Sequence, residues 1–280
     1  NLPFDGAILT STQRVFVGLD SFALLAIPFF ILAGNLMNNG GIAIRLINCA
    51  KIISNFLPGP LAQTNVVANM LFGSISGSGV ASAAAIGGIM SPIQKKDNYD
   101  PAFSAAVNIA SAPTGMLIPP SNSLIVYATV AGSVSITALF MGGYIPGILW
   151  GLGVMLVAGF IAKRRGYVAD KGSLKGLRLK LLLDAIPSLM MIVVVIGGIL
   201  GGIFTATEAS AIAVVYSLAL GICYRNIKAA DLPAIFLASL FVTAPFGLHS
   251  KAEHRHGEFD GRQMNVVFVV RVVQHAVETD

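Results

Sequence analysis

Charged side chains are scarce in this chain of 280 residues. Asp, Glu, Lys and Arg together make up 11% of it, whereas a soluble domain usually carries about 25%. Hydrophobic residues make up 55%, and the mean hydropathy is +0.78. The 30 glycines and 13 prolines would break helices in water but are tolerated in membrane helices. These proportions exclude an ordinary soluble domain and predict an all-α protein that crosses a lipid bilayer several times.

Reactive side chains are also few. Cys49 and Cys223 stand alone, without the spacing of a metal or redox pair. The histidines lie only near the end of the chain, at His249, His254, His256 and His275. The apolar body has no Ser-His-Asp set, no glycine-rich phosphate loop and no metal-ligand spacing. We therefore expect no enzyme, no cofactor and no metal centre built from Cys or His ligands.

The net charge of +5 does not indicate a nucleic-acid partner. The basic residues lie in short loops between apolar runs, which is the pattern of cytoplasmic loops in membrane proteins. The first residues, NLPFDGAILTST, lack the basic n-region of a signal peptide, and the chain begins with Asn1 rather than Met. We expect from this that the chain is a fragment.

Long apolar runs alternate with short polar loops. A membrane span needs about 20 apolar residues. The runs that reach or approach this length are 15–37, 136–162, 185–204, 207–224 and 232–248. Between residues 42 and 57, Arg45 and Lys51 interrupt the apolar pattern, which predicts an amphipathic helix at the membrane interface.

The distribution of basic loops favours a re-entrant hairpin at residues 63–90. The loop 163–180 is rich in Lys and Arg and is therefore expected on the cytoplasmic side. Counting spans backward from it places Lys95 on the same side. Lys51 joins them only if the segment 63–90 enters and leaves the membrane through one face. The two short arms of such a hairpin would be 63–73 and 79–90.

Two stretches inside apolar segments are typical of broken helices: GSISGSG at 73–79 and GMLIPPSNS at 115–123. Non-helical backbone at membrane depth is tolerated only inside protein or beside a water-filled cavity. Pro119 and Pro120 leave upstream carbonyls unpaired, and free carbonyls with Ser and Asn oxygens suit Na⁺. A half-helix that starts after either break offers free N–H groups, which suit an anion. Paired broken segments are typical of the binding site of a secondary transporter.

Some of these residues have a second interpretation. Small residues such as those at 81–85 also suit close packing of membrane helices. Asn108 lies in an otherwise apolar segment and fits either an interhelical hydrogen bond or the polar site. Glu208, where two spans meet, is either a functional intramembrane acid or part of a helix cap with Thr205 or Thr207. The cap is the favoured interpretation.

Four stretches carry a resemblance to a known family: GLDSFALLAIPFFILAGNLMNNGGIAIRLI, MLFGSISGSGVASAAAIGGIM, YDPAFSAAVNIASAPTGMLIPPSNSLIVYA and GGIFTATEASAIAVVYS. In this order they resemble the large membrane subunit of tripartite ATP-independent periplasmic (TRAP) transporters, the DctM-like permeases. The resemblance implies an elevator-type, Na⁺-coupled importer in a bacterial inner membrane, with C4-dicarboxylates, sugar acids or similar carboxylates as substrates. It also implies two partners, a small four-helix membrane subunit (DctQ-like) and a periplasmic solute-binding protein (DctP-like).

In this family the hairpin tip and the facing broken helix hold Na⁺. Carried onto this chain, the resemblance implies Na⁺ ligands at the tip and, through backbone carbonyls, at the second break: Ser74, Ser76, Ser78, Gly115, Ile118 and Pro120. Further residues are expected near the ion and the substrate: Gly77, Asn108, Ser121 and Asn122.

The chain departs from the family pattern in several places. Gly79 stands where the family usually has Ser, so one hydroxyl ligand is expected to be missing. Ala206 stands in TATEA, where TPTEA is usual. The resemblance extends over about residues 15–236, and the sequence drifts from about Ser239. Much of the second inverted repeat of the family, with its own hairpin and broken helix, is expected to be absent.

The expected organisation has four parts. They are a scaffold span with an interfacial helix (1–57), a transport-type region with the hairpin 63–90 and a broken helix 101–131 (58–135), further transmembrane helices with the start of a second repeat (136–248), and a polar tail unlike the family (249–280). The expected function is that of a permease subunit importing organic anions. Three alternatives stay open: a truncated component that acts only in assembly, another Na⁺/anion symporter, and a channel.

Overall fold

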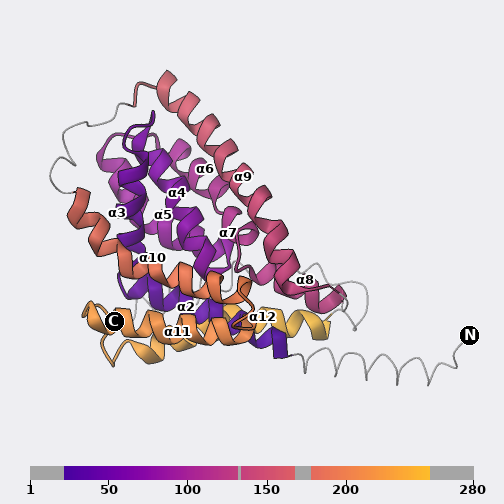
Figure 1. Ribbon diagram of the computed structural model, residues 1–280. Helices are drawn as coiled ribbons and strands as arrows, with labels where there is room; N and C mark the ends of the chain where they lie inside the picture. Colours follow the sequence, from indigo (N-terminus) through magenta and orange to yellow (C-terminus); the bar gives the residue numbers. More distant parts are fainter. Residues whose placement is uncertain (1–21, 132–133, 168–177, 253–280) are drawn as a thin grey trace, which may run out of the picture. The chain divides into compact units, whose positions relative to one another are not determined.

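The computed structural model describes residues 22–131, 134–167 and 178–252 (Figure 1). The chain divides into two units, Asn1–Thr243 and Ala244–Asp280, and all contacts given below lie in the first. Of the second unit, only the end of one helix, up to Ala252, is described. The start of the expected first span, the middle of the basic loop 163–180 and the tail from residue 253 lie outside the described residues.

Every regular element in the described part of the chain is a helix, as the composition predicts. In chain order the helices are η1 (Phe22–Leu25), α2 (Ala26–Asn39), α3 (Ile42–Ser54), α4 (Pro60–Ser76), α5 (Gly79–Lys96), α6 (Pro101–Ser111), α7 (Thr114–Leu117), α8 (Asn122–Ala131), α9 (Ile136–Arg164), α10 (Arg178–Leu200), α11 (Ala206–Cys223) and α12 (Leu232–Ala252).

Three of the described helices are long and apolar enough to cross a bilayer: α9, the segment Leu181–Leu200 of α10, and α11. The helices α2 and α3 meet at a bend of 75°, and counting this bent pair as one span gives a fourth. The three long helices agree with the spans expected at 136–162, 185–204 and 207–224 to within a few residues. The chain is therefore a multi-pass membrane protein.

The helix α3 is amphipathic, as Arg45 and Lys51 predict, but protein covers its apolar face. Leu46, Ile47 and Ala50 are fully buried, and α3 packs against α4 and α10. Arg45 forms an ion pair with Asp184 of α10, with 3.2 Å between Nε and Oδ1. The amphipathic pattern of this helix is therefore observed, and its buried face packs on neighbouring helices. Its expected place at the membrane interface stays a prediction.

The helices α4 and α5 form an antiparallel hairpin. Gln94 Nε2, near the end of α5, donates to the Leu61 carbonyl at the start of α4 over 3.2 Å. Midway along the pair, Ser82 Oγ donates to Asn69 Oδ1 over 2.6 Å. The arms are longer than the expected 63–73 and 79–90, because residues 73–76 continue α4 and only two residues separate the helices.

The expected broken helix at 101–131 is observed as three pieces, α6, α7 and α8. The non-helical gap between α7 and α8 is shorter than the predicted 115–123, since Gly115 lies within α7 and Asn122 begins α8. Backbone groups of Pro119 and Pro120 cannot donate hydrogen bonds, which ends the helix there.

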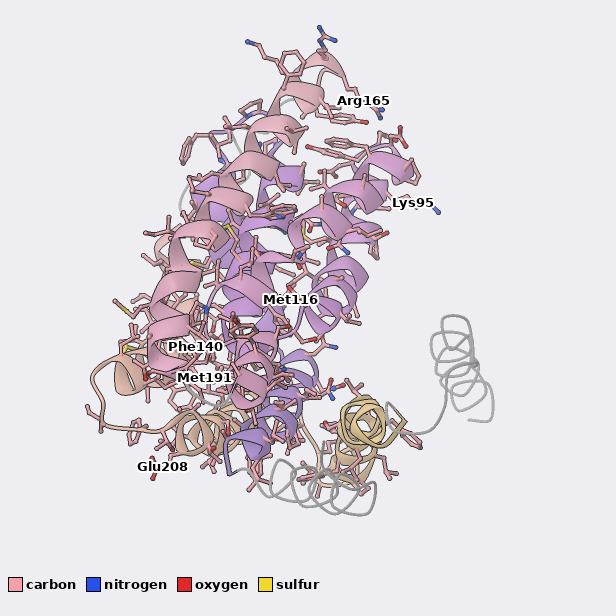
Figure 2. All side chains as sticks on the ribbon, turned by 90° about the vertical axis from the view of Figure 1, so that its right-hand side faces the viewer. Lys95, Met116, Phe140, Arg165, Met191 and Glu208 are labelled. Atoms are coloured by element: carbon pink, nitrogen blue, oxygen red, sulfur yellow. The ribbon has the colours of Figure 1, made fainter. Side chains whose placement is uncertain are left out.

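One end of the hairpin is tied to the end of α9. Asp100, the N-cap of α6, forms an ion pair with Arg165, and its backbone N–H donates to the Tyr167 hydroxyl over 3.0 Å. The Tyr167 ring stacks on Tyr99 with 4.1 Å between centroids. Figure 2 shows Lys95 and Arg165 at this same end, with Met116 farther along the helices. The two basic segments therefore lie together, as the charge pattern predicts.

The core joins the hairpin to α2, α10 and α11, which lie side by side (Figure 1). The largest fully buried side chains include Phe30, Phe72 and Phe140. Asn35 of α2 donates to Ser239 Oγ of α12 over 2.8 Å. Near the hairpin tip, a Cβ on Gly34 of α2 would lie 2.9 Å from Ser76 Cβ, so α2 packs directly against the end of α4.

Candidate functional site

The hairpin tip consists of Gly77 and Ser78, and the local backbone conformation explains why each residue type occurs there. Gly77 adopts the left-handed conformation (φ +63°) and its N–H donates to the Gly73 carbonyl over 2.9 Å, which is a C-terminal cap of α4. Ser78 is extended, and its Oγ accepts from the Ala81 N–H over 3.3 Å as the N-cap of α5. A sharp reversal between two helices follows.

The second break is held by Ser121. Its Oγ donates to the Met116 carbonyl over 2.5 Å and accepts from the Leu124 N–H over 3.4 Å, so one side chain joins the end of α7 to the start of α8. Ile118 is extended, and the Pro119–Pro120 bond is cis. The carbonyl oxygens of Ile118 and Pro120 accept no hydrogen bond from any described residue.

The two breaks are in direct contact. The Asn122 backbone N–H donates to the Gly77 carbonyl over 3.1 Å, and Asn122 Nδ2 reaches the Ser76 carbonyl at 3.5 Å. One turn away, the backbones of Gly73 and Gly115 touch, since a Cβ on Gly115 would lie 2.8 Å from the Gly73 Cα. The structure thus brings together the two segments that the sequence singles out.

Oxygen atoms without partners gather beside Gly77. Asn122 is 4% exposed, and its Oδ1 is buried without a hydrogen-bond partner. A Cβ on Gly77 would lie 2.9 Å from the Pro120 carbonyl oxygen and 3.2 Å from Asn122 Oδ1. Because burying an unpaired acceptor is costly, a cation bound by neutral oxygens would be stabilised at this spot. That is the chemistry expected of Na⁺.

The remaining predicted residues are distributed unevenly. Ser76 is fully buried, and its Oγ lies 3.4 Å from the Ser78 carbonyl. Ser74 Oγ donates to the Leu71 carbonyl of its own helix over 2.8 Å, and no described contact joins it to the second break. Asn108 Nδ2 donates to the Ala83 carbonyl over 2.9 Å, which is the interhelical bond that its surroundings allowed.

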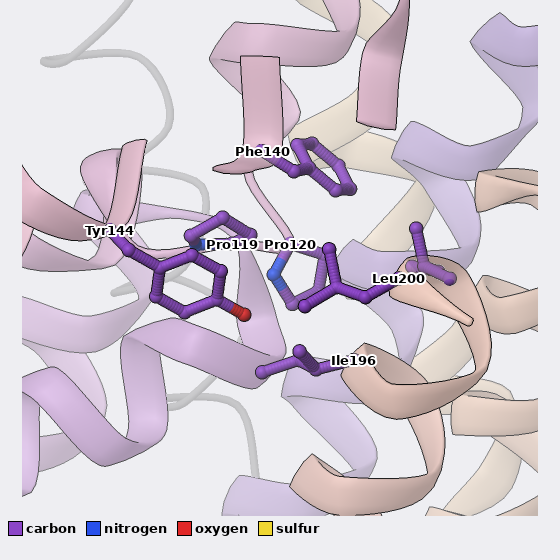
Figure 3. Close-up of a pocket in the computed structure, with 7 residues that line it drawn as sticks. Pro119, Pro120, Phe140, Tyr144, Ile196 and Leu200 are labelled. Atoms are coloured by element: carbon purple, nitrogen blue, oxygen red, sulfur yellow. The ribbon is translucent and has the colours of Figure 1, made fainter. Parts of the chain in front are cut away.

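The helix α9 packs against the second break, a contact that the sequence analysis did not predict. A Cβ on Gly143 would overlap the Leu117 carbonyl, and one on Gly147 would lie 2.6 Å from Ile118 Cγ1. A small apolar cavity on this side has no room for a water molecule and is lined by Pro119, Pro120, Phe140, Tyr144, Ile196, Ile199 and Leu200 (Figure 3). The spacing of Gly143, Gly147 and Gly151 is the signal that could have revealed the packing face.

Two further positions answer questions that the sequence raised. Glu208 forms a capping box with Thr205: the Glu208 N–H donates to Thr205 Oγ1 over 3.3 Å, and Glu208 Oε2 accepts from the Thr205 N–H over 2.8 Å. The cap is therefore confirmed. At Gly79 a Cβ would lie 3.1 Å from both the Ala112 carbonyl oxygen and Met116 Sδ, so glycine makes room for Met116.

The comparison with known families agrees with this arrangement. Residues 5–247 match the family described as tripartite ATP-independent periplasmic transporter, DctM component. The chain belongs to the DctM family. Its members are transporter permeases rather than enzymes. The match is wider than the expected 15–236, so the drift placed at about Ser239 is wrong, and family-like sequence continues to residue 247.

Individual relatives share much of the chain. The chain is 56% identical over 244 residues to the uncharacterized protein YgiK of Salmonella typhimurium, covering 87% of the chain and 56% of the relative. It is 43% identical over 213 residues to the isethionate TRAP transporter permease protein DctMQ of Oleidesulfovibrio alaskensis, covering 75% of the chain and 33% of the relative. It is 39% identical over 216 residues to the sialic acid TRAP transporter large permease protein SiaM of Vibrio cholerae, covering 77% of the chain and 50% of the relative. The chain thus spans a third to just over half of these relatives.

Proposed function

We propose that this DctM-family chain serves in the large permease subunit of a Na⁺-coupled secondary transporter that imports organic carboxylates. The observation that carries the proposal is the contact between the tip of the α4–α5 hairpin and the break between α7 and α8. Beside it lie the unpartnered Asn122 Oδ1 and the carbonyl of Pro120. Broken helices that face each other across neutral oxygens are the usual arrangement of such a site.

The hairpin is proposed to be re-entrant from the cytoplasmic side of a bacterial inner membrane. An α4 of 17 residues is about 25 Å long, which is less than the roughly 30 Å of a hydrocarbon core. The tip would then lie deep in the membrane while Lys51 and Lys95 stay on one side. Cysteines introduced at these two lysines are expected to react with an impermeant maleimide from the same side, and labelling from opposite sides would refute re-entry.

The substrate and partners are proposed by analogy with the relatives. Relatives are named as permeases for isethionate, sialic acid and C4-dicarboxylate. These compounds share an anionic group, so we propose an organic anion, most simply a carboxylate, delivered by a periplasmic solute-binding protein. A small four-helix membrane subunit completes the proposed assembly. The proposed movement is that of an elevator, in which the hairpin and broken helix shift together.

Asn122→Ala tests the proposed cation site directly. Interactions of a polar group with a charge contribute about 1.5–3 kcal/mol, so the Na⁺ concentration for half-maximal uptake is expected to rise roughly 10- to 150-fold. Ser76→Ala removes a buried hydroxyl at the tip and is expected to weaken Na⁺ dependence less. The control is Ser104→Ala in α6, which removes a buried, unpartnered hydroxyl away from the breaks.

The assay is uptake into proteoliposomes that hold the intact permease, its small subunit and the binding protein. An unchanged Na⁺ dependence in Asn122→Ala would refute the assigned site. The alternative of a component that only assists assembly is tested in the same system. Reconstituting the present chain with both partners in place of the intact permease should then give no uptake, while the chain still co-purifies with the small subunit.

A further inference from the structure

A buried polar network joins α4, α5 and α6 below the hairpin tip, and Asn69 is its centre. Asn69 Nδ2 lies 2.8 Å from Ser111 Oγ and 3.1 Å from Asn108 Oδ1, both on α6. Asn69 Oδ1 accepts from Ser82 Oγ of α5 over 2.6 Å. A single side chain on one arm of the hairpin therefore binds the other arm and the broken helix at once.

The members of this network are mostly buried and depend on one another for their hydrogen bonds. Asn69, Ser82 and Ser111 are fully buried. Asn108 is fixed by its bond to the Ala83 carbonyl, and α5 has Gly87 where any Cβ would overlap the Asn108 amide. Removing one member leaves the others buried and unsatisfied, which costs more than the bond itself contributes.

The network lies one helical turn below the glycine contact and two turns below the tip. On α4, Asn69 is followed one turn later by Gly73 and two turns later by Gly77. Ser111 is the last residue of α6, and Gly115, whose backbone touches Gly73, lies four residues later in α7. On α4 each of these steps is a continuous helical turn of about 5.4 Å, so the network fixes the distance from the end of α6 to the tip along α4.

We propose that Asn69 is a positioning residue of the cation site, which holds the hairpin tip in register with the second break. This rests on the proposed function, because it needs a cation between the breaks. Asn69 is not itself a ligand, since its amide is occupied by Ser82, Asn108 and Ser111. Its loss acts on the ion by changing the spacing between Gly77 and Asn122.

The test compares Asn69→Ala with Asn65→Ala. Asn65 lies one turn earlier on the same helix, is 1% exposed and bonds only Asn69 within its own arm. Its Nδ2 has no partner, so truncating it leaves every interhelical bond in place. The two variants thus make the same chemical change at the same depth of burial, and they differ in whether α4 stays tied to α5 and α6.

The readout is the thermal unfolding midpoint of the purified intact permease across a series of NaCl concentrations, with choline chloride keeping ionic strength constant. A ligand that binds only the folded state raises this midpoint as its concentration passes the dissociation constant. The rise follows the logarithm of 1 + [Na⁺]/Kd and has no plateau, so fitting the series gives the dissociation constant for Na⁺. We expect this dissociation constant to rise on the order of tenfold in Asn69→Ala. In Asn65→Ala it is expected to stay within about twofold.

Asn108→Ala provides a second route should Asn69→Ala fail to fold. Asn108 is only partly buried, and its loss removes one of the two ties between α4 and α6. It is expected to shift the dissociation constant for Na⁺ in the same direction, and the double variant is expected to shift the corresponding free energy by less than the sum of the two single variants.

The outcomes separate this inference from the function on which it rests. If the unsubstituted permease shows no specific response to Na⁺, the proposed function fails. If it responds, and the Asn69 and Asn108 variants lower the unfolding temperature without changing the dissociation constant for Na⁺, the network is only structural and the inference is overturned.

Discussion

Gly73→Ala is the sharpest test of the contact between the two breaks. A Cβ at position 73 would overlap the backbone Cα of Gly115, and no side-chain rotation relieves that overlap. Overpacking costs about 1–3 kcal/mol, whereas replacing a helical glycine by alanine gains up to about 1 kcal/mol of helix propensity. The net effect on the free energy of unfolding is therefore expected to range from almost none to a loss of about 2 kcal/mol.

Gly88→Ala on the other arm of the hairpin isolates the contact from the propensity. A Cβ at Gly88 meets nothing within 4 Å, so this variant receives the propensity gain alone. The difference between the two variants is then the overpacking cost of about 1–3 kcal/mol, whatever the exact propensity. Unfolding in mixed micelles with increasing SDS measures it. Equal stability of the two variants would show that the helices do not meet at Gly73.

Three further predictions concern the surroundings of the site. Gly147→Ala is expected to weaken Na⁺-dependent uptake several-fold because its methyl group presses on the second break, while Gly153→Ala on the same helix meets open space and leaves uptake unchanged. Thr205→Ala removes the helix cap and is expected to lower the free energy of unfolding by about 1 kcal/mol, measured in mixed micelles, without changing the Na⁺ concentration for half-maximal uptake. The hydrogen bond from Arg165 holds the pKa of Asp100 below its usual range, so the stability it contributes is present above the ordinary carboxyl pKa of about 3.9 and is lost as the pH falls through the lower folded pKa. Asp100→Asn is therefore expected to lower the unfolding midpoint at pH 7, with the difference from the unsubstituted protein disappearing once the pH has fallen through the lowered pKa of Asp100.

Local chemistry explains what could be predicted from the sequence. Basic residues placed the two ends of the hairpin together, because charges avoid hydrocarbon and mark the loops. Gly77 and the pair Pro119–Pro120 marked the breaks, because one supplies the left-handed conformation that ends α4 and the other cannot donate hydrogen bonds. These signals act on their own residues and need no knowledge of the neighbours.

The errors have a common physical cause, which is tertiary contact. Ser74 and Ser76 have a weak preference for helix, yet they continue α4 because buried backbone must make its hydrogen bonds. The burial of one face of α3 against α4 and α10 likewise depends on neighbours that the sequence of α3 does not reveal. The network around Asn69 joins residues from three helices, and their sequence spacing gives no sign of the contact.

The proposed ion would be held at the tip without any formal negative charge. The segment from Ile52 to Gln94 contains no ionisable side chain, and the oxygens beside Gly77 come from a carbonyl and an amide. A cation bound there leaves a net positive charge in a poorly solvated place, where an anion nearby is stabilised far more than in water. Since a coupling free energy is reciprocal, an anionic substrate would raise the affinity for Na⁺ by the factor by which Na⁺ raises the affinity for the substrate. A carboxylate ligand at the tip would neutralise the ion and remove that coupling, which gives a physical reason for a tip made of glycine, serine and backbone.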